Sequence, residues 1–199
     1  MNKSTSKNKH IALFGGKFDP PHLGHQLTVF LALEKFSMDE VWVIPTFSHP
    51  FGFQSSSYDL RFRMTEDMVL PWKNTGRVKV LGIEKEMGTK IVHTVDVIEL
   101  LTKRHPDYSF HLFIGEDNWK VKNKWKNFSK IEELCDEVIV IGRGKSDYDL
   151  SLPDISSTEI RDMIKNGKDP SKFLPKGIWQ LIKERKIYSS KGQTPSSLQ

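Results

Sequence analysis

The chain of 199 residues contains a single cysteine, Cys135, which excludes a disulfide framework and a multi-cysteine metal site within one chain. Its apolar neighbours predict a buried position at the end of a helix. No apolar run approaches the roughly 20 residues of a membrane span. The polar, lysine-rich residues 1–9 are not followed by the apolar segment of a secretory signal. These absences predict a soluble, cytoplasmic protein with no membrane partner.

Two common nucleotide-binding patterns are also absent. The chain has neither G-x-G-x-x-G nor a G-K-[ST] loop, which argues against a dehydrogenase or a P-loop kinase. No run of five basic residues occurs, although the net charge is +5. That charge suits a polyanionic small ligand as well as nucleic acid. Because no recognition motif or basic-aromatic stripe is present, we expect no nucleic-acid partner.

Short apolar runs alternate with amphipathic stretches along the chain, and 37% of the residues are hydrophobic, enough for a core. Strands are predicted over 11–14, 41–45, 77–83, 108–115 and 137–142. Helices are predicted over 23–36, 59–70, 93–104, 119–134, 157–165 and 176–185. This alternation predicts an α/β fold, a doubly wound and mostly parallel five-stranded sheet with a helical C-terminal extension. Ligands bind at the carboxyl edge of such sheets.

A glycine turn followed by two histidines is the most informative local pattern. The run GGKFDPPHLGH occupies residues 15–25, between the first predicted strand and the first predicted helix. Such a turn directs backbone N–H groups and a helix N-terminus at a phosphate. His22 and His25 are three residues apart and so share one helical face. Since only Asp19 is a nearby third ligand, the pattern favours a site for several phosphates over a metal site.

The run ISSTEIR near the C-terminal end is the second informative pattern. Ser156 and Glu159 have the spacing of a capping box, which makes Ser156 the expected N-cap of a helix. Capping needs one hydroxyl, yet Ser157 and Thr158 add two more, and Arg161 follows about one turn later. Hydroxyls, free backbone N–H groups and a guanidinium together form an anion site. We therefore interpret this helix start as a phosphate-binding element.

A third pattern, FIGEDNW, lies in the middle of the chain. Gly115 at a strand end lets a flat ligand approach the backbone, and Asp117 can accept hydrogen bonds from a ribose or an adenine amine. Trp119 or Trp125 can stack on a base. An ordinary strand–helix loop with packed tryptophans is the alternative, and this pattern alone does not choose between them.

Taken in order, GGKFDPPHLGH, FIGEDNWKVKNKW and ISSTEIR resemble the nucleotidylyltransferase superfamily of the H-x-G-H type, and more closely the bacterial nicotinate (or nicotinamide) mononucleotide adenylyltransferases. The resemblance spans 10–188 and implies one Rossmann-like nucleotidylyltransferase domain there, with flexible tails at 1–9 and 189–199. It also implies an enzyme of NAD biosynthesis that transfers the adenylyl group of ATP to a pyridine mononucleotide and releases pyrophosphate. A phosphate nucleophile is already ionised, so catalysis needs positioning and charge stabilisation rather than a base.

The resemblance implies a role for residues of each motif. His22 and His25 would donate hydrogen bonds to the ATP phosphates, and Arg161 is the third catalytic residue. The nucleotide-binding set comprises Gly15, Gly16, Phe18, Gly115, Asp117, Ser156, Ser157 and Thr158. The acceptor-binding set comprises His49, Thr94, Asp96, Trp119 and Trp125. Mg²⁺ is implied as an ion that bridges phosphates with few protein ligands of its own.

The chain departs from the family pattern in three places. Lys17 stands where a small Ser or Thr is common. Residues 47–52 lack the Pro-Pro-His-Lys run of the nicotinate enzymes, and Thr-x-Asp-Thr is altered to Val-His-Thr-Val-Asp at 92–96. The last two changes fall where the pyridine nucleotide is expected. Two alternatives therefore stay open, another phosphorylated acceptor such as phosphopantetheine and a nucleotide-binding regulator without turnover. A homo-oligomer is left open as well.

Overall fold

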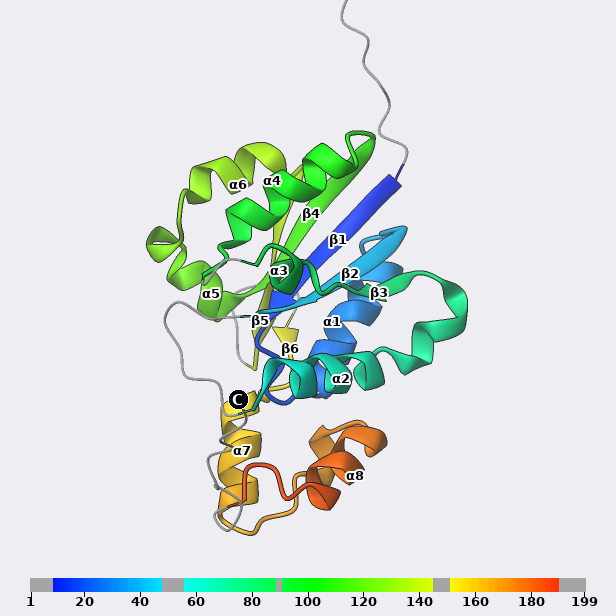
Figure 1. Ribbon diagram of the computed structural model, residues 1–199, viewed down its shortest axis with the longest axis vertical. Helices are drawn as coiled ribbons and strands as arrows, with labels where there is room; N and C mark the ends of the chain where they lie inside the picture. The colour runs from blue at the N-terminus through cyan, green and yellow to red at the C-terminus, as the bar shows by residue number, and fades with distance from the viewer. Residues whose placement is uncertain (1–8, 48–55, 89–90, 145–150, 190–199) are drawn as a thin grey trace, which may run out of the picture.

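The computed structural model describes residues 9–47, 56–88, 91–144 and 151–189, and within them six strands form one parallel sheet (Figure 1). The strands are β1 (Lys9–Gly16), β2 (Glu40–Pro45), β3 (Val78–Val80), β4 (Tyr108–Gly115), β5 (Glu137–Arg143) and β6 (Ser151–Leu152). Their spatial order is β3-β2-β1-β4-β5-β6. The predicted α/β class and its five parallel strands are confirmed. The sixth strand, β6, was not predicted, because two residues are too short to show a pattern.

Helices cover both faces of the sheet (Figure 1). They are α1 (Leu23–Glu34), α2 (Tyr58–Met68), α3 (Ile83–Glu86), α4 (Thr94–Arg104), α5 (Glu116–Lys120), α6 (Phe128–Leu134), α7 (Ser157–Lys165) and α8 (Lys176–Glu184). Single 3₁₀ turns occur at η1 (Leu70–Thr75), η2 (Lys122–Lys124) and η3 (Ser171–Phe173). Buried side chains of α1, α2, α7 and α8 pack on one face, and those of α3, α4 and α6 on the other. None of the helices in the described ranges is long and apolar enough to cross a bilayer.

Consecutive residues of the central strand β1 supply both cores. Ala12 and Phe14 pack with α1 and α2, whereas Ile11 and Leu13 pack with α4 and α6. A parallel strand that is covered on both faces is apolar throughout instead of alternating. The continuous apolar run that predicted this strand is therefore a direct consequence of its central place in the sheet.

One predicted helix is wrong in its extent. The sequence predicts a single helix over 119–134, but the structure divides this stretch into the end of α5, η2 and α6. Trp125 is extended, and Asn127 adopts the left-handed conformation with φ of 48° before α6 begins. Asparagine tolerates that conformation better than most residues, so it starts a new helix there. The predicted burial of Cys135 at a helix end is confirmed, since it is the buried C-cap of α6.

The predicted strand at 77–83 is also shorter than expected, with only Val78–Val80 in β3. Leu81 and Gly82 then lead directly into α3. Only the two ends of the predicted loop at 46–57 are described, namely Thr46, Phe47, Ser56 and Ser57. His49 lies outside the described residues.

The sheet has a topological switch point beside β1. The chain proceeds from β1 to β2 and β3 on one side, and then returns to β4 and β5 on the other. In open α/β sheets the crevice beyond the carboxyl ends of the strands at such a point binds ligands. The strand ends that meet there are Gly16 of β1 and Gly115 of β4.

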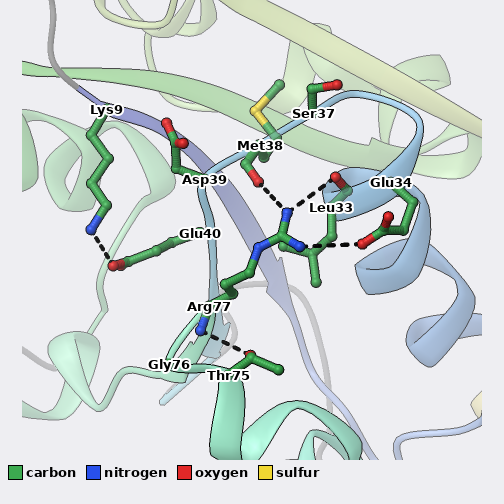
Figure 2. Close-up of a pocket in the computed structure, with 10 residues that line it drawn as sticks. All are labelled: Lys9, Leu33, Glu34, Ser37, Met38, Asp39, Glu40, Thr75, Gly76 and Arg77. Atoms are coloured by element: carbon green, nitrogen blue, oxygen red, sulfur yellow. Dashed lines mark hydrogen bonds and ion pairs between the residues drawn. The ribbon is translucent and has the colours of Figure 1, made fainter.

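A cavity of about 620 Å³ lies at the opposite, amino edge of the sheet (Figure 2). Its charged side chains bind one another or backbone groups. Arg77 donates to the carbonyl oxygens of Leu33 and Met38 at 3.3 and 3.1 Å, and Lys9 forms an ion pair with Glu40. We therefore interpret these contacts as ties between strand starts and α1, and look for chemistry at the carboxyl edge.

Candidate active site

The glycine turn ends β1 and is held from two sides. The amide of Thr46 donates to the Gly16 carbonyl at 2.9 Å, which ties the turn to the end of β2. Phe18 is buried with a left-handed φ of 50°, so the chain reverses there and the ring packs beneath the turn. A Cβ added to Gly16 would lie only 3.1 Å from that ring. Glycine is thus required at 16 by close packing, and its backbone faces the carboxyl edge.

The two histidines are stacked at the start of α1. His22 is the buried N-cap residue, and its backbone N–H donates to Nδ1 of His25 at 3.1 Å. Their ring centroids are 3.8 Å apart. A Cβ on Gly24 would lie 3.0 Å from the His22 ring, so the glycine between the histidines gives that ring its place.

Both histidines are neutral in the free protein. Burial, with a smaller effect of the Arg143 charge, lowers the pKa of His22 to about 3. Burial and the proximity of His22 lower the pKa of His25 well below its ordinary value. Because Nδ1 of His25 accepts a hydrogen bond, the single ring proton of the neutral imidazole resides on Nε2. His25 can therefore donate from Nε2 to a phosphate oxygen, as the sequence predicts.

The start of α7 docks on the loop that precedes the histidines. Ser157 Oγ donates to the Pro20 carbonyl at 2.8 Å, and Arg161 Nη1 donates to the Asp19 carbonyl at 2.7 Å. A second nitrogen of Arg161 donates to Thr158 Oγ1 at 3.1 Å. Two motifs that are far apart in the sequence thus form one edge, with the hydroxyls and guanidinium of α7 next to the histidine pair.

The predicted capping box of α7 is confirmed. Ser156 Oγ accepts from the amide of Glu159 at 3.1 Å, and the Glu159 carboxylate accepts from the Ser156 amide at 2.9 Å. These bonds occupy the Ser156 hydroxyl in helix capping, so the groups that remain for an anion are those of the next residues.

Arg143 at the end of β5 connects the histidines with the third motif. It contributes to the low pKa of both histidines, and it forms an ion pair with Asp117 at 3.1 Å. A Cβ on Gly115 would be 3.7 Å from its guanidinium. Sequence analysis assigned no role to Arg143. The available signal was an arginine at the carboxyl end of a predicted parallel strand.

A cavity of about 460 Å³ opens at the switch point, beside Gly15 and Gly16. Two residues of the predicted acceptor set, Thr94 and Trp125, line it. Asp96 instead caps α4 by accepting from the His93 amide at 3.3 Å, and it pairs with Lys126.

Trp119 is placed differently from the other tryptophan of the predicted acceptor set. It packs edge-on against Phe128 in the second core, with the Lys122 ammonium 3.4 Å from its ring centre. Its indole is therefore held by two protein neighbours.

Glu84 of α3 also lines this cavity, although the sequence did not single it out. Its side chain is buried, and its carboxylate accepts from the Phe47 amide at 2.7 Å. Burial raises the pKa of Glu84 to about 7, with the Phe47 bond and the Arg61 charge acting in the other direction. Glu84 therefore anchors the first described end of the 46–57 loop.

Arg61 of α2 is the second residue that sequence analysis missed. It is fully buried and donates to the carbonyl oxygens of Lys17 at 2.8 Å and Ser56 at 3.4 Å. Arg61 shares the buried face of α2 with Met64 and Met68. An arginine in an apolar helical stripe was the signal that could have identified it.

Asp19 joins three distant segments behind the site. Its buried carboxylate accepts from the Tyr188 hydroxyl at 2.6 Å and from the Ser56 hydroxyl. The chain after α8 and the end of the 46–57 loop are therefore both tied to the loop that carries the histidines. The described residues contain no group of three His, Cys, Asp or Glu side chains arranged to hold a metal ion.

Known proteins share the sequence and the fold of this chain. Residues 13–163 match the cytidylyltransferase-like family. The probable nicotinate-nucleotide adenylyltransferase of Myxococcus xanthus (strain DK1622) is 35% identical over 189 residues, 93% of this chain and 97% of that protein. The protein of the same name from Bacillus pumilus (strain SAFR-032) is 33% identical and covers 92% of this chain and 100% of that protein. The solved structure of Plasmodium falciparum nicotinic acid mononucleotide adenylyltransferase complexed with NaAD has a TM-score of 0.77 at 19% identity, and covers 91% of this chain and 98% of that chain.

Proposed function

The chain belongs to the nicotinate-nucleotide adenylyltransferases of the cytidylyltransferase-like family, and from this membership we propose that it transfers the adenylyl group of ATP to nicotinate mononucleotide. The products are pyrophosphate and a dinucleotide of the NAD type. The enzyme class follows from the shared sequence, and the assignment of individual residues to this reaction is the further content of the proposal.

One observation supports this function above the others. The N-terminus of α7, with Ser157 and Arg161, is bound to the loop that carries His22 and His25, and the cavity opens beside the same glycine turn. Helix N–H groups, hydroxyls and a guanidinium suit the triphosphate of a nucleotide. The adjoining cavity then suits a second substrate that must reach the α-phosphate.

The reaction needs no proton acceptor in the protein. An oxygen of the acceptor phosphate forms a bond to the α-phosphorus of ATP, and the bond from that phosphorus to the bridging oxygen breaks as pyrophosphate leaves. His22 and His25, neutral in the free protein, donate hydrogen bonds to the phosphate oxygens that gain charge. Thr158 and Arg161 hold the departing pyrophosphate.

The adenosine end of ATP is proposed to bind near Gly115 and Asp117. Gly115 ends β4 and leaves room above the backbone, and the neighbouring Asp117 carboxylate is exposed apart from its ion pair with Arg143. The carboxylate can accept from ribose hydroxyls on its open side. Arg143 then stands between the ribose and the histidine pair.

The charge of the acceptor cavity favours nicotinate over nicotinamide mononucleotide. Lys17, Lys124 and Lys126 all line it, and only Lys126 forms an ion pair with a described carboxylate, Asp96. Nicotinate carries a carboxylate that nicotinamide lacks, so a cationic rim attracts the former more strongly.

Mg²⁺ is part of the proposal as a companion of the triphosphate. Because the described residues offer no cluster of three metal-ligating side chains, phosphate oxygens and water would supply most of its ligands. The ion would neutralise charge on the leaving pyrophosphate, beside Arg161.

A pyrophosphate-release assay with ATP tests the proposed function. The acceptors are nicotinate mononucleotide, nicotinamide mononucleotide and phosphopantetheine, with an acceptor-free reaction as control, and mass spectrometry identifies the product. We expect release with the pyridine mononucleotides, fastest with nicotinate. Release with phosphopantetheine alone would change the acceptor. ATP binding without release from any acceptor would show a nucleotide-binding regulator.

A further inference from the structure

Lys17 is fixed at the boundary between the histidine loop and the acceptor cavity. It follows Gly16, and its carbonyl oxygen accepts from the buried Arg61 guanidinium at 2.8 Å. The next residue, Phe18, reverses the chain with a left-handed φ of 50°. Its backbone is therefore held on both sides while its side chain lines the cavity.

The Lys17 ammonium has no counter-ion in the described part of the chain. No hydrogen bond or ion pair joins it to a described side chain or carbonyl, although the residue is half-buried. Other lysines contrast with it, since Lys79, Lys85 and Lys126 each lie 2.8 Å from a carboxylate oxygen. A half-buried cation that faces a cavity without a partner is suited to an anionic ligand.

The charges around Lys17 add to this requirement. Burial and the positive charge of Arg161 lower the pKa of Lys17, and the Asp19 charge opposes them. The Asp19 carboxylate, however, already accepts hydrogen bonds from Tyr188 and Ser56. An arriving phosphate would therefore relieve the repulsion between the two cations and supply the partner that Lys17 lacks.

We infer that Lys17 is a catalytic residue that binds the phosphate of the acceptor and stays in contact with it as it meets the α-phosphate of ATP. This inference rests on the proposed function, and it adds a residue to which the motifs assign no role. Lys17 lines the cavity that would hold the acceptor, and its electrostatic neighbour Arg161 belongs to the triphosphate side.

Lys17 acts by charge and keeps its protons throughout the reaction. Two phosphate groups repel each other as the acceptor oxygen approaches the α-phosphorus, and an ammonium beside both reduces that repulsion. The attacking oxygen supplies the electron pair of the new bond, and the pair of the broken bond departs with pyrophosphate. Since the two phosphates are closest in the transition state, the stabilisation is greatest there and raises kcat.

Binding experiments isolate the contact from turnover. Because Trp125 lines the cavity, tryptophan fluorescence can report titrations with nicotinate mononucleotide and with nicotinate riboside, which lacks the phosphate. Lys17→Met should weaken mononucleotide binding about tenfold, as expected for the loss of a charged hydrogen bond. It should leave riboside binding unchanged. Lys103→Met, on the exposed side of α4, is the matched control and should alter neither.

Steady-state kinetics measure the effect on the reaction. Lys17→Met should lower kcat about 100-fold, the scale of one lost transition-state donor, with the KM for ATP within about threefold of wild type. Lys17→Arg retains the charge and should recover most of the rate. Circular dichroism and thermal melting confirm that each variant folds.

The outcomes separate this inference from the proposed function. Wild-type kcat and mononucleotide affinity in Lys17→Met would overturn the role of Lys17 while adenylyl transfer stands. Equal weakening of mononucleotide and riboside would overturn it too, because the cavity shape would then have changed. A wild-type protein without turnover, whose Lys17→Met variant still loses mononucleotide affinity alone, would refute adenylyl transfer and retain the phosphate contact.

Discussion

Replacing Glu84 by glutamine should stabilise the protein at alkaline pH and leave its stability almost unchanged near pH 4. Glu84 is buried, and its pKa is raised to about 7 in the folded state from an ordinary value of 4.5. Between these pH values the unfolded chain has released a proton that the folded chain still binds. Wild-type stability therefore falls as the pH rises from about 4.5 through 7.

The size of the effect follows from the gap between the two pKa values. It corresponds to about 3 kcal/mol in the free energy of unfolding, fully developed above pH 7. Glutamine retains an oxygen that can accept from the Phe47 amide, but it has no charge to desolvate. We thus expect Glu84→Gln to be about 3 kcal/mol more stable than wild type at pH 8. For a domain of this length that is a rise of about 6 to 12 °C in Tm.

Urea unfolding followed by tryptophan fluorescence at pH 4.5, 6, 7 and 8 measures the effect. Glu86→Gln is the matched control, since Glu86 lies on the same helix with an exposed carboxylate that pairs with Arg104. Its stability should follow wild type at every pH. If Glu84→Gln gained no stability between pH 4.5 and 8, the carboxyl would be ionised throughout. The argument from burial would then be refuted.

The remaining predictions concern the phosphate-binding edge, with pyrophosphate release as the assay. Gly24→Ala should lower kcat at least tenfold, because its Cβ would lie 3.0 Å from the His22 ring and displace it, whereas Gly177→Ala meets nothing within 4 Å and should be silent. Equal rates in both would show that the place of the ring is unimportant. His25→Ala should lower kcat about 100-fold with an unchanged circular dichroism spectrum, and near-normal turnover would remove it from the site. Arg161→Ala should mainly raise the KM for ATP; an unchanged KM would exclude it from triphosphate binding.

Patterns carried by neighbouring residues were predicted well from the sequence. The strand predicted over 108–115 coincides with β4, and the helix predicted over 157–165 coincides with α7. Both depend on local features, an apolar run closed by Gly115 and a capping box that begins at Ser156. The divided helix at 119–134 was missed because a single left-handed residue, Asn127, interrupts an otherwise helical pattern.

The candidate site was predictable only in part, because its supports are distant in sequence. Parallel strands bring their carboxyl ends to one edge, so the glycine turn and Gly115 were expected to meet. Arg61 binds the carbonyl of Lys17 across 44 residues, and Tyr188 binds Asp19 across 169. No spacing rule links such pairs, so they emerge only once the chain has folded.

The bond between Tyr188 and Asp19 has a consequence for the order in which the protein is made. The histidine loop is synthesised among the first residues, but its carbonyls and the Asp19 carboxylate bind partners on α7 and after α8. A nascent chain that still lacks these segments carries the histidines without the groups that hold their loop. Synthesis at the ribosome therefore completes the nucleotide site late, and a fragment released early would lack the edge that binds the triphosphate.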